Sequence, residues 1–211
     1  MDNFDNIGKL LRAGKATEIK TETQELLDKG NDPKTILEDG LMPAMATIGE
    51  LFKENKIFVP EMLIAARAMN ASIDVLKPLM VEGAMSGKGT VVLGTVKGDL
   101  HDIGKNLVRI MMEGKGLNVI DLGVDVSPEK FVQAAQEHNA QLIACSALLT
   151  TTMQAMADVV SAFKEAGLYD RVGIMVGGAP VTQGFCDTIG AHIYSDNAAS
   201  AADDALAFIG S

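Results

Sequence analysis

The sequence has few of the features that mark secreted or membrane-spanning proteins. It contains no tryptophan, 4% aromatic residues and only two cysteines among 211 residues. The cysteines, Cys145 and Cys186, are too few for a disulfide framework, as in proteins of a reducing compartment. No apolar run reaches the length of a transmembrane helix, and the acidic N-terminus lacks the basic and apolar regions of a signal peptide. We therefore expect a cytoplasmic protein with no membrane association.

Basic residues are also scarce. The chain has 18 lysines and arginines against 28 aspartates and glutamates, a net charge of −10. Binding to nucleic acid or to an anionic membrane surface requires a basic face, so neither is an expected partner. Hydrophobic residues, in contrast, make up 47% of the sequence, which is enough for a packed core and excludes a disordered chain.

The first half of the sequence has helical periodicity throughout. Apolar residues recur at helical spacing over residues 7–11, 19–27, 36–52 and 59–76. Four helices with short connections predict a small antiparallel bundle. Residues 82–89 contain three glycines without periodicity and are the expected interdomain linker. The predicted domains are therefore residues 1–86 and 87–211.

The second half alternates strand-like and helix-like segments. Repeated strand–helix units predict a parallel sheet with helices on both faces. Five units match the flavodoxin-like member of the doubly wound class, so we expect an α/β fold: a four-helix bundle cap followed by a five-stranded parallel sheet. The expected strands are 91–95, 118–121, 142–146, 173–176 and 192–194, and the expected helices are 103–113, 128–138, 152–166, 182–189 and 198–209.

A histidine and an aspartate lie in the loop after the first expected strand. Asp99, His101 and Gly104 form a D-x-H-x-x-G pattern at the strand's carboxyl end, where open α/β sheets bind ligands. A histidine that ligates a metal usually donates its second ring N–H to a carboxylate, a role that Asp99 fits. A tetrahedral zinc site is disfavoured because one histidine is too few. A lone loop histidine is more often a solvated residue, but this pair suits an axial ligand of a metal held in a macrocycle.

Hydroxyl groups and glycines follow the third and fourth expected strands. Ser146 ends the third strand, Leu148 and Thr150 follow it, and Gly177 and Gly178 follow the fourth. The hydroxyls can simply cap the next helix, and the glycines can form a turn. Several hydroxyls at one sheet edge also indicate a polar pocket, and glycines let an elongated group pass close to the backbone.

At their spacing, the D-x-H-x-x-G, S-x-L and G-G motifs together resemble the signature of the cobalamin-binding domain family. The resemblance implies that His101 is the metal ligand, bound to the lower face of the cobalt in a corrinoid. It also implies that the cofactor's nucleotide tail runs past the serine and the glycine pair. The cofactor-binding residues implied in this half are Asp99, His101, Asp102, Ile103, Gly104, Ser146, Leu148, Thr150, Gly177 and Gly178.

Residues 49–61 resemble the helical cap of methyl-transferring corrinoid proteins. These include methionine synthase and the small corrinoid proteins of methanol, methylamine and methoxy-compound metabolism. In the family an aromatic and an aliphatic residue shield the upper face of cobalt, and these positions fall on Phe52 and Val59, which would otherwise be ordinary bundle core. A hydroxyl that extends the histidine–aspartate pair falls on Thr152, where the family often has serine. His101, Asp99 and Thr152 are therefore the candidate catalytic residues.

The resemblance implies a methyl carrier rather than a self-sufficient enzyme. A substrate-specific methyltransferase would methylate Co(I) to methyl-Co(III), as in methylcobalamin. A second methyltransferase would then deliver the methyl group to tetrahydrofolate or to a thiol such as coenzyme M, and a corrinoid reductive activase would be a further partner. The donor could be a methylamine, methanol, a betaine or a methoxylated aromatic compound. Since the cap would block partners, it must move, and residues 83–89 are the candidate hinge.

Two alternative functions share parts of this pattern. The cobalamin-binding subunit of a radical mutase has the three motifs but needs no such cap. A cobalamin-sensing regulator has a similar cap but usually carries an output module, for which the sequence has no spare segment. An unrelated flavodoxin-like or response-regulator domain would explain neither the cap nor the spacings.

Overall fold

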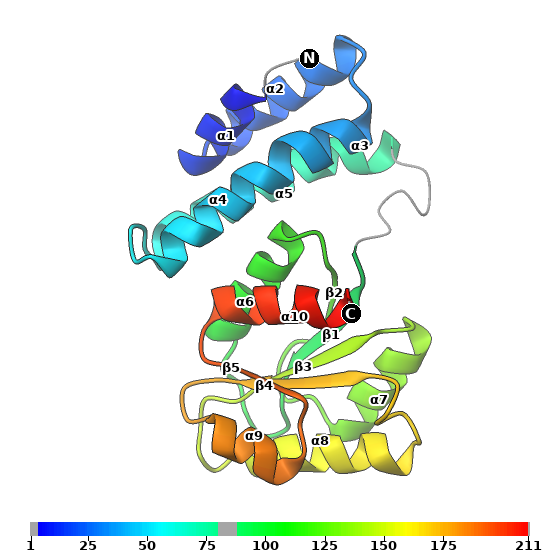
Figure 1. The fold of residues 1–211 in the computed structure, drawn as a ribbon. Helices are drawn as coiled ribbons and strands as arrows, with labels where there is room; N and C mark the ends of the chain where they lie inside the picture. Colours follow the sequence, from blue (N-terminus) through cyan, green and yellow to red (C-terminus); the bar gives the residue numbers. More distant parts are fainter. Residues whose placement is uncertain (1–3, 80–87, 211) are drawn as a thin grey trace. The chain divides into compact units, whose positions relative to one another are not determined.

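The computed structural model describes residues 4–79 and 88–210, and the chain divides into two compact units, residues 1–86 and 87–211 (Figure 1). Of the expected linker and hinge, only residues 88 and 89 lie within the described ranges. Within those ranges, none of the helices is both long and apolar enough to cross a membrane. Each unit has its own helices and core, so the two are described in turn.

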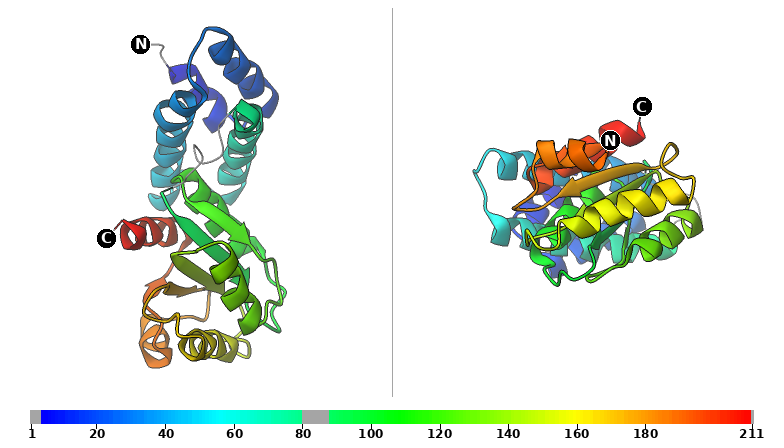
Figure 2. Two further views of the ribbon diagram at one scale, coloured as in Figure 1. Left: turned by 90° about the vertical axis from the view of Figure 1, so that its right-hand side faces the viewer. Right: turned by 90° about the horizontal axis from the view of Figure 1, so that it is seen from below.

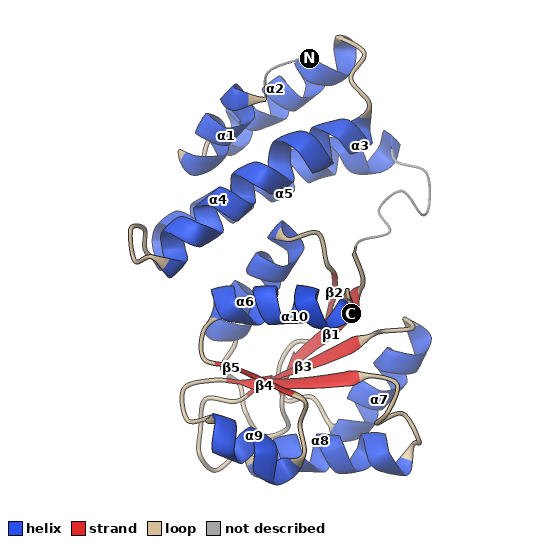
Figure 3. Ribbon diagram, viewed as in Figure 1, coloured by secondary structure: helices blue, strands red, loops and turns tan. Residues whose placement is uncertain are grey.

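Over its described residues, 4–79, the N-terminal unit forms helices and no strand, as predicted (Figure 3). Helix α5 packs against α2, α1 and α4, and its buried side contains mostly alanine and methionine. A buried polar contact joins two of the helices, because the hydroxyls of Thr23 on α2 and Ser72 on α5 lie 2.5 Å apart. The helices are α1 (Asp5–Arg12), α2 (Ala16–Asp28), α3 (Pro33–Thr35), α4 (Met42–Lys53) and α5 (Val59–Leu76), which a 3₁₀ turn (Lys77–Leu79) follows.

The third expected helix is not regular. The carboxylate of Asp32 accepts hydrogen bonds from the backbone N–H groups of Lys34 and Thr35, which starts the helix as α3. A π-helical segment (Ile36–Leu41) then separates α3 from α4. Pro43 gives the physical reason: it has no N–H to donate, and its ring would clash with the carbonyl four residues earlier in a regular α-helix. The wider π turn accommodates both effects.

The C-terminal unit is a five-stranded parallel sheet with the strand order β2-β1-β3-β4-β5, which confirms the predicted flavodoxin-like fold. Each strand and helix begins and ends within two residues of its predicted bounds. The strands are β1 (Thr90–Thr95), β2 (Asn118–Asp121), β3 (Leu142–Ser146), β4 (Gly173–Gly177) and β5 (Ile193–Ser195). The helices are α6 (Ile103–Gly114), α7 (Pro128–Glu137), α8 (Gln154–Glu165), α9 (Gln183–Ile189) and α10 (Ala198–Ile209).

Helices cover both faces of this sheet. Helices α6 and α10 pack against each other on one face, and α7, α8 and α9 lie on the other, where α8 (yellow) is in front of the strands when viewed from below (Figure 2, right). The second face covers a hydrophobic core in which Phe131 on α7 and Phe163 on α8 are fully buried. Gly94 in β1 makes room for this core, since a Cβ there would lie 2.8 Å from the ring of Phe131. The faces are thus closed, and the carboxyl ends of β1, β3 and β4 present their loops along one edge.

Candidate functional site

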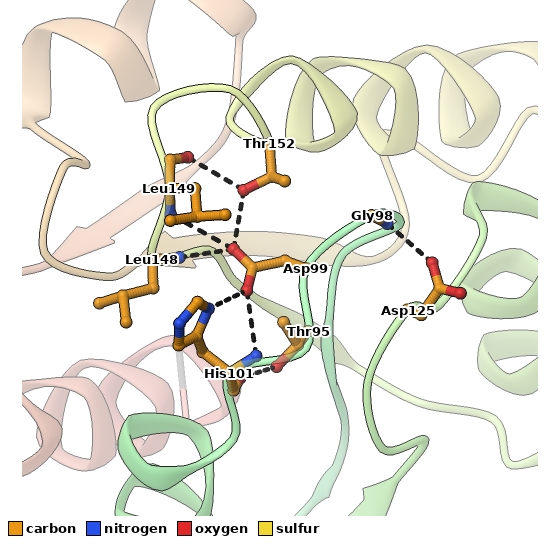
Figure 4. A network of polar contacts seen from close by, with 8 residues as sticks. All are labelled: Thr95, Gly98, Asp99, His101, Asp125, Leu148, Leu149 and Thr152. Carbon is orange, nitrogen blue, oxygen red and sulfur yellow. Dashed lines mark hydrogen bonds and ion pairs between the residues drawn. The ribbon is translucent and has the colours of Figure 1, made fainter.

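A buried carboxylate organises the loops at this edge (Figure 4). Asp99 lies in the loop after β1, and its side chain is completely buried. Its Oδ1 faces His101, accepting from the backbone N–H at 3.1 Å and from ring Nδ1 at 2.7 Å. Its Oδ2 faces the loop after β3, accepting from the backbone N–H groups of Leu148 (2.8 Å) and Leu149 (3.3 Å) and from the Thr152 hydroxyl (2.7 Å). One carboxylate therefore joins two loops about 50 residues apart in sequence.

These contacts keep Asp99 ionised. Burial by itself would raise the pKa of Asp99, but the hydrogen bonds from the Leu148 N–H, the Thr152 hydroxyl and His101 hold that pKa well below its usual value of 3.8. An ionised carboxylate only accepts hydrogen bonds, so Nδ1 of His101 carries the proton that it donates to Asp99. In the neutral ring, Nε2 then has a free lone pair. Since the side chain of His101 is 50% exposed, this nitrogen is suited to ligate a metal.

Large apolar side chains surround the histidine without being covered by the protein. Leu100 and Ile103, on either side of it in sequence, are 72% and 78% exposed. Leu148 and Leu149, whose N–H groups bind Asp99, are also exposed. Exposed apolar side chains gathered at one sheet edge mark a binding surface for an apolar partner. A flat macrocycle would cover such a surface while its metal meets the ring nitrogen.

The donor set within the described residues fits such a group better than a bare ion. No cluster of three or more histidine, cysteine, aspartate or glutamate side chains capable of holding a metal occurs among residues 4–79 and 88–210. At this edge, the protein supplies one oriented imidazole, that of His101, rather than the four ligands of a structural zinc site. A metal that brings its own macrocycle needs only this one axial ligand.

The structure aligns other predicted residues along the same edge. Ser146, the last residue of β3, is paired in register with Thr95 of β1 and with Gly177 of β4. At Gly104, in the first turn of α6, an added Cβ would meet nothing within 4 Å, so the protein leaves this surface open. The nearby predicted residues Asp102, Ile103 and Thr150 are exposed.

Gly178 has a structural role that the motif did not indicate. Its φ of +132° is disfavoured for residues with a side chain, and an added Cβ would lie 1.9 Å from the backbone oxygen of Ala147. The loops after β3 and β4 therefore meet backbone to backbone. Phe52 and Val59 belong to the N-terminal unit, at the end of α4 and the start of α5, and both are half-buried. Their role at the cofactor stays a prediction.

Three side chains near the site were not predicted from the sequence. Lys105 is almost completely buried and forms an ion pair with Asp121 at the end of β2 (2.6 Å), which ties the start of α6 to the sheet. Thr95 and Asp125 contact the loop that carries His101. Polar residues at strand ends are common, so no sequence pattern distinguishes these contacts from ordinary loop residues.

Asp99→Asn is expected to destabilise the C-terminal unit by about 2–3 kcal/mol, the range for buried hydrogen bonds to a charged group. The amide would present an NH₂ group to donors that need an acceptor. Because the folded-state pKa of Asp99 is lowered, its stabilising effect is complete above about pH 4 and is lost as the pH falls below that value. The free energy of unfolding in urea, measured at pH 7 and at pH 3, should differ less between wild type and variant at the lower pH.

The matched control for this measurement is Asp102→Asn. Asp102 is exposed, and its carboxylate accepts a hydrogen bond from the side-chain amide of Asn106 at 3.1 Å. Its replacement should change the free energy of unfolding by less than about 0.5 kcal/mol. Equal destabilisation by both substitutions would contradict the role assigned to the buried carboxylate.

Both units of the chain match known protein families. Two family models, each described as a B12 binding domain, match residues 89–204 and 4–77. Dimethylamine corrinoid protein 1 of Methanosarcina acetivorans is 47% identical over 171 residues, which cover 81% of this chain and 80% of the relative. Trimethylamine corrinoid protein 1 of the same organism is 45% identical over 177 residues, 83% of this chain and 82% of the relative.

Solved structures agree with the sequence relatives. A chain in the crystal structure of the methanol:cobalamin methyltransferase complex from Methanosarcina barkeri has a TM-score of 0.87 at 33% identity, covering 97% of this chain and 78% of that chain. A cobalamin-binding protein from Desulfitobacterium hafniense has a TM-score of 0.78 at 30% identity, with 99% of both chains covered.

Proposed function

Since this chain belongs to the family of B12-binding corrinoid proteins that carry methyl groups in methyltransferase systems, we propose that its methyl donor is a methylamine, with dimethylamine the first to test. The donor proposal is supported by the 47% identity to a dimethylamine corrinoid protein and the 45% identity to a trimethylamine corrinoid protein. When bound, the corrinoid supplies a cobalt that accepts a methyl group and gives it up. The chain would hold and position this cofactor, and its partner enzymes would supply and remove the methyl group.

His101 is the proposed lower ligand of the cobalt. The observation that carries this proposal is the 2.7 Å contact between Nδ1 of His101 and buried Asp99, which leaves Nε2 free at an exposed apolar edge. Asp99 fixes the ring's tautomer and orientation. Thr152 holds Asp99 in turn, and its hydroxyl would let a proton pass to or from the Asp99 carboxylate. These three residues form the catalytic group in our proposal.

The remaining predicted residues would position the cofactor. Asp102, Ile103 and Gly104 lie at the start of α6, close in sequence to the proposed ligand. The loops after β3 and β4 would hold the nucleotide tail, and two cap residues would shield the upper face of the cobalt. The tail residues are Ser146, Leu148, Thr150, Gly177 and Gly178, and the cap residues are Phe52 and Val59.

The protein acts with other enzymes rather than alone. A substrate methyltransferase is its partner, in keeping with the methanol:cobalamin methyltransferase complex that contains a similar chain. We further propose a second methyltransferase that passes the methyl group to a thiol such as coenzyme M, with tetrahydrofolate the other acceptor to test. A reductive activase would return oxidised cobalt to its active state.

The donor is tested by methylating the reduced, cobalamin-loaded protein. The protein is mixed in turn with purified dimethylamine, trimethylamine, monomethylamine and methanol methyltransferases, each with its substrate, while the visible spectrum of cobalamin reports methylation. We expect the dimethylamine pair to react at least about tenfold faster than the methanol pair, a preference worth roughly 1.4 kcal/mol. Fastest methylation by the methanol pair would overturn the methylamine proposal, and failure to bind cobalamin would overturn the carrier function.

A further inference from the structure

Thr95 holds the backbone of the proposed metal ligand. It is the last residue of β1, its side chain is fully buried, and its hydroxyl donates a 2.8 Å hydrogen bond to the carbonyl oxygen of His101 (Figure 4). The N–H of His101 donates to Asp99 at 3.1 Å. Both backbone polar groups of the histidine are therefore occupied, and the residue keeps freedom mainly in its side-chain torsions.

Asp125 holds the other end of the same loop. Its Oδ1 accepts a 2.7 Å hydrogen bond from the N–H of Gly98, and its own N–H donates to the carbonyl of Asp99 at 3.0 Å. Gly98 and Asp125 have φ values of +83° and +54°, in the left-handed region. The paired contacts span the turn that directs Asp99 into the protein, and they stabilise a backbone shape that few residues adopt unaided.

The segment that carries Asp125 is itself attached to the sheet. The N–H of Thr95 donates to the carbonyl of Gly123, and the N–H of Val126 donates to the carbonyl of Thr95, each at 3.0 Å. Val96 and Val126 form a parallel bridge beyond the end of β1. Asp125 therefore acts from a fixed position, and the loop of residues 97–101 lies between two anchors, one buried at Thr95 and one exposed at Asp125.

We propose that Thr95 and Asp125 are positioning residues that hold His101 in place for cobalt before the corrinoid binds. The inference rests on the proposed role of His101 as the lower ligand. A metal ligand must lie within about 0.5 Å and about 10–20° of its productive position. If the loop were free to move, ordering it would cost part of the free energy of cofactor binding. Neither residue touches the metal; each acts through the backbone of the loop.

The substitutions are chosen in pairs that separate the hydrogen bond from the fold. Thr95→Val keeps the shape of the buried side chain and removes the donor, whereas Thr95→Ser keeps the donor. Asp125→Gly removes the acceptor but tolerates a positive φ, whereas Asp125→Asn keeps an acceptor oxygen and also tolerates that conformation. The exposed Asp125 pair gives an independent answer if Thr95→Val folds poorly.

The readout is which nitrogen ligates the cobalt. The full-length protein is labelled with ¹⁵N-histidine and loaded with Co(II) cobalamin, and its EPR spectrum is recorded. A ¹⁵N ligand from the protein splits each cobalt line into two, while the unlabelled base of the cofactor splits it into three. This signal measures histidine coordination directly and does not depend on turnover. His101→Ala serves as the reference for complete loss of the protein ligand.

We expect the ratio of histidine-ligated cobalamin to cobalamin without a histidine ligand to fall about three- to tenfold in Thr95→Val and Asp125→Gly, the effect of losing one hydrogen bond. In Thr95→Ser and Asp125→Asn the same ratio should stay within about twofold of wild type, a smaller change than the loss of a full hydrogen bond causes. Wild-type ratios in both Thr95→Val and Asp125→Gly, with complete loss in His101→Ala, would overturn the positioning role alone. Two-line splitting retained in His101→Ala would instead overturn the proposed ligand.

Discussion

His101→Ala is expected to abolish the histidine-coordinated visible spectrum of bound cobalamin and to slow methyl transfer about a hundredfold, the upper end of the effect of disturbing groups around a metal ligand. The variant removes the imidazole whose Nδ1 lies 2.7 Å from Asp99. Asp99 keeps its contacts with Leu148 and Thr152, so the loops should stay folded. The loss should therefore concern the metal and not the stability of the unit.

The measurement combines the absorption spectrum with a transfer assay, and added imidazole provides a rescue. Millimolar imidazole should restore part of the ligated spectrum, because the site can accept a free ligand once the side chain is absent. His138→Ala is the matched control, since His138 is exposed at the end of α7, outside the predicted site. A spectrum unchanged in His101→Ala would show that His101 is not the lower ligand.

Gly178→Ala is expected to destabilise the apo-protein by roughly 3–5 kcal/mol, the combined effect of backbone strain and of overpacking. A Cβ at this position would lie 1.9 Å from the oxygen of Ala147, and the φ of +132° is essentially restricted to glycine. The backbone of two neighbouring loops would have to separate. A loss of this size is a large share of the 5–15 kcal/mol that stabilises an ordinary domain.

The free energy of urea unfolding, measured without cofactor, checks this expectation. Gly184→Ala is the control, because Gly184 lies in α9 and an added Cβ there meets nothing within 4 Å. That substitution should leave stability unchanged or raise it by up to about 1 kcal/mol, as alanine favours helix. If Gly178→Ala unfolds within 1 kcal/mol of wild type, the two loops can separate freely and the glycine is present for the ligand alone.

The fold could be predicted from the sequence because its signals are local. Strands such as 142–146 are short apolar runs, and the helices between them have their own apolar periodicity. The π-helical segment before α4 was missed, since whether Pro43 kinks, ends or widens a helix depends on how the surrounding turns pack. The regular pattern of residues 36–52 gave no sign of this choice.

In the site too, local contacts could be predicted and contacts between distant segments could not. Asp99 and His101 are two residues apart, so their contact follows from one loop and could be inferred directly. Leu149 and Thr95 each contribute through one hydrogen bond to the loop of Asp99 and His101, and Asp125 contributes through two. Many polar side chains and backbone N–H groups can form such a hydrogen bond, so the residue type does not predict which residue forms it.

By itself, the sequence determined the two-part architecture, the strand-end histidine with its carboxylate, and the family to which these motifs belong. Only the tertiary structure decided that Asp99 is buried and ionised, that Thr95 and Asp125 anchor its loop, and that Gly178 is required by the approach of Ala147. The physical reason is that periodicity and short motifs depend on neighbours along the chain. Burial and hydrogen bonding depend on which distant segments the packed sheet brings together.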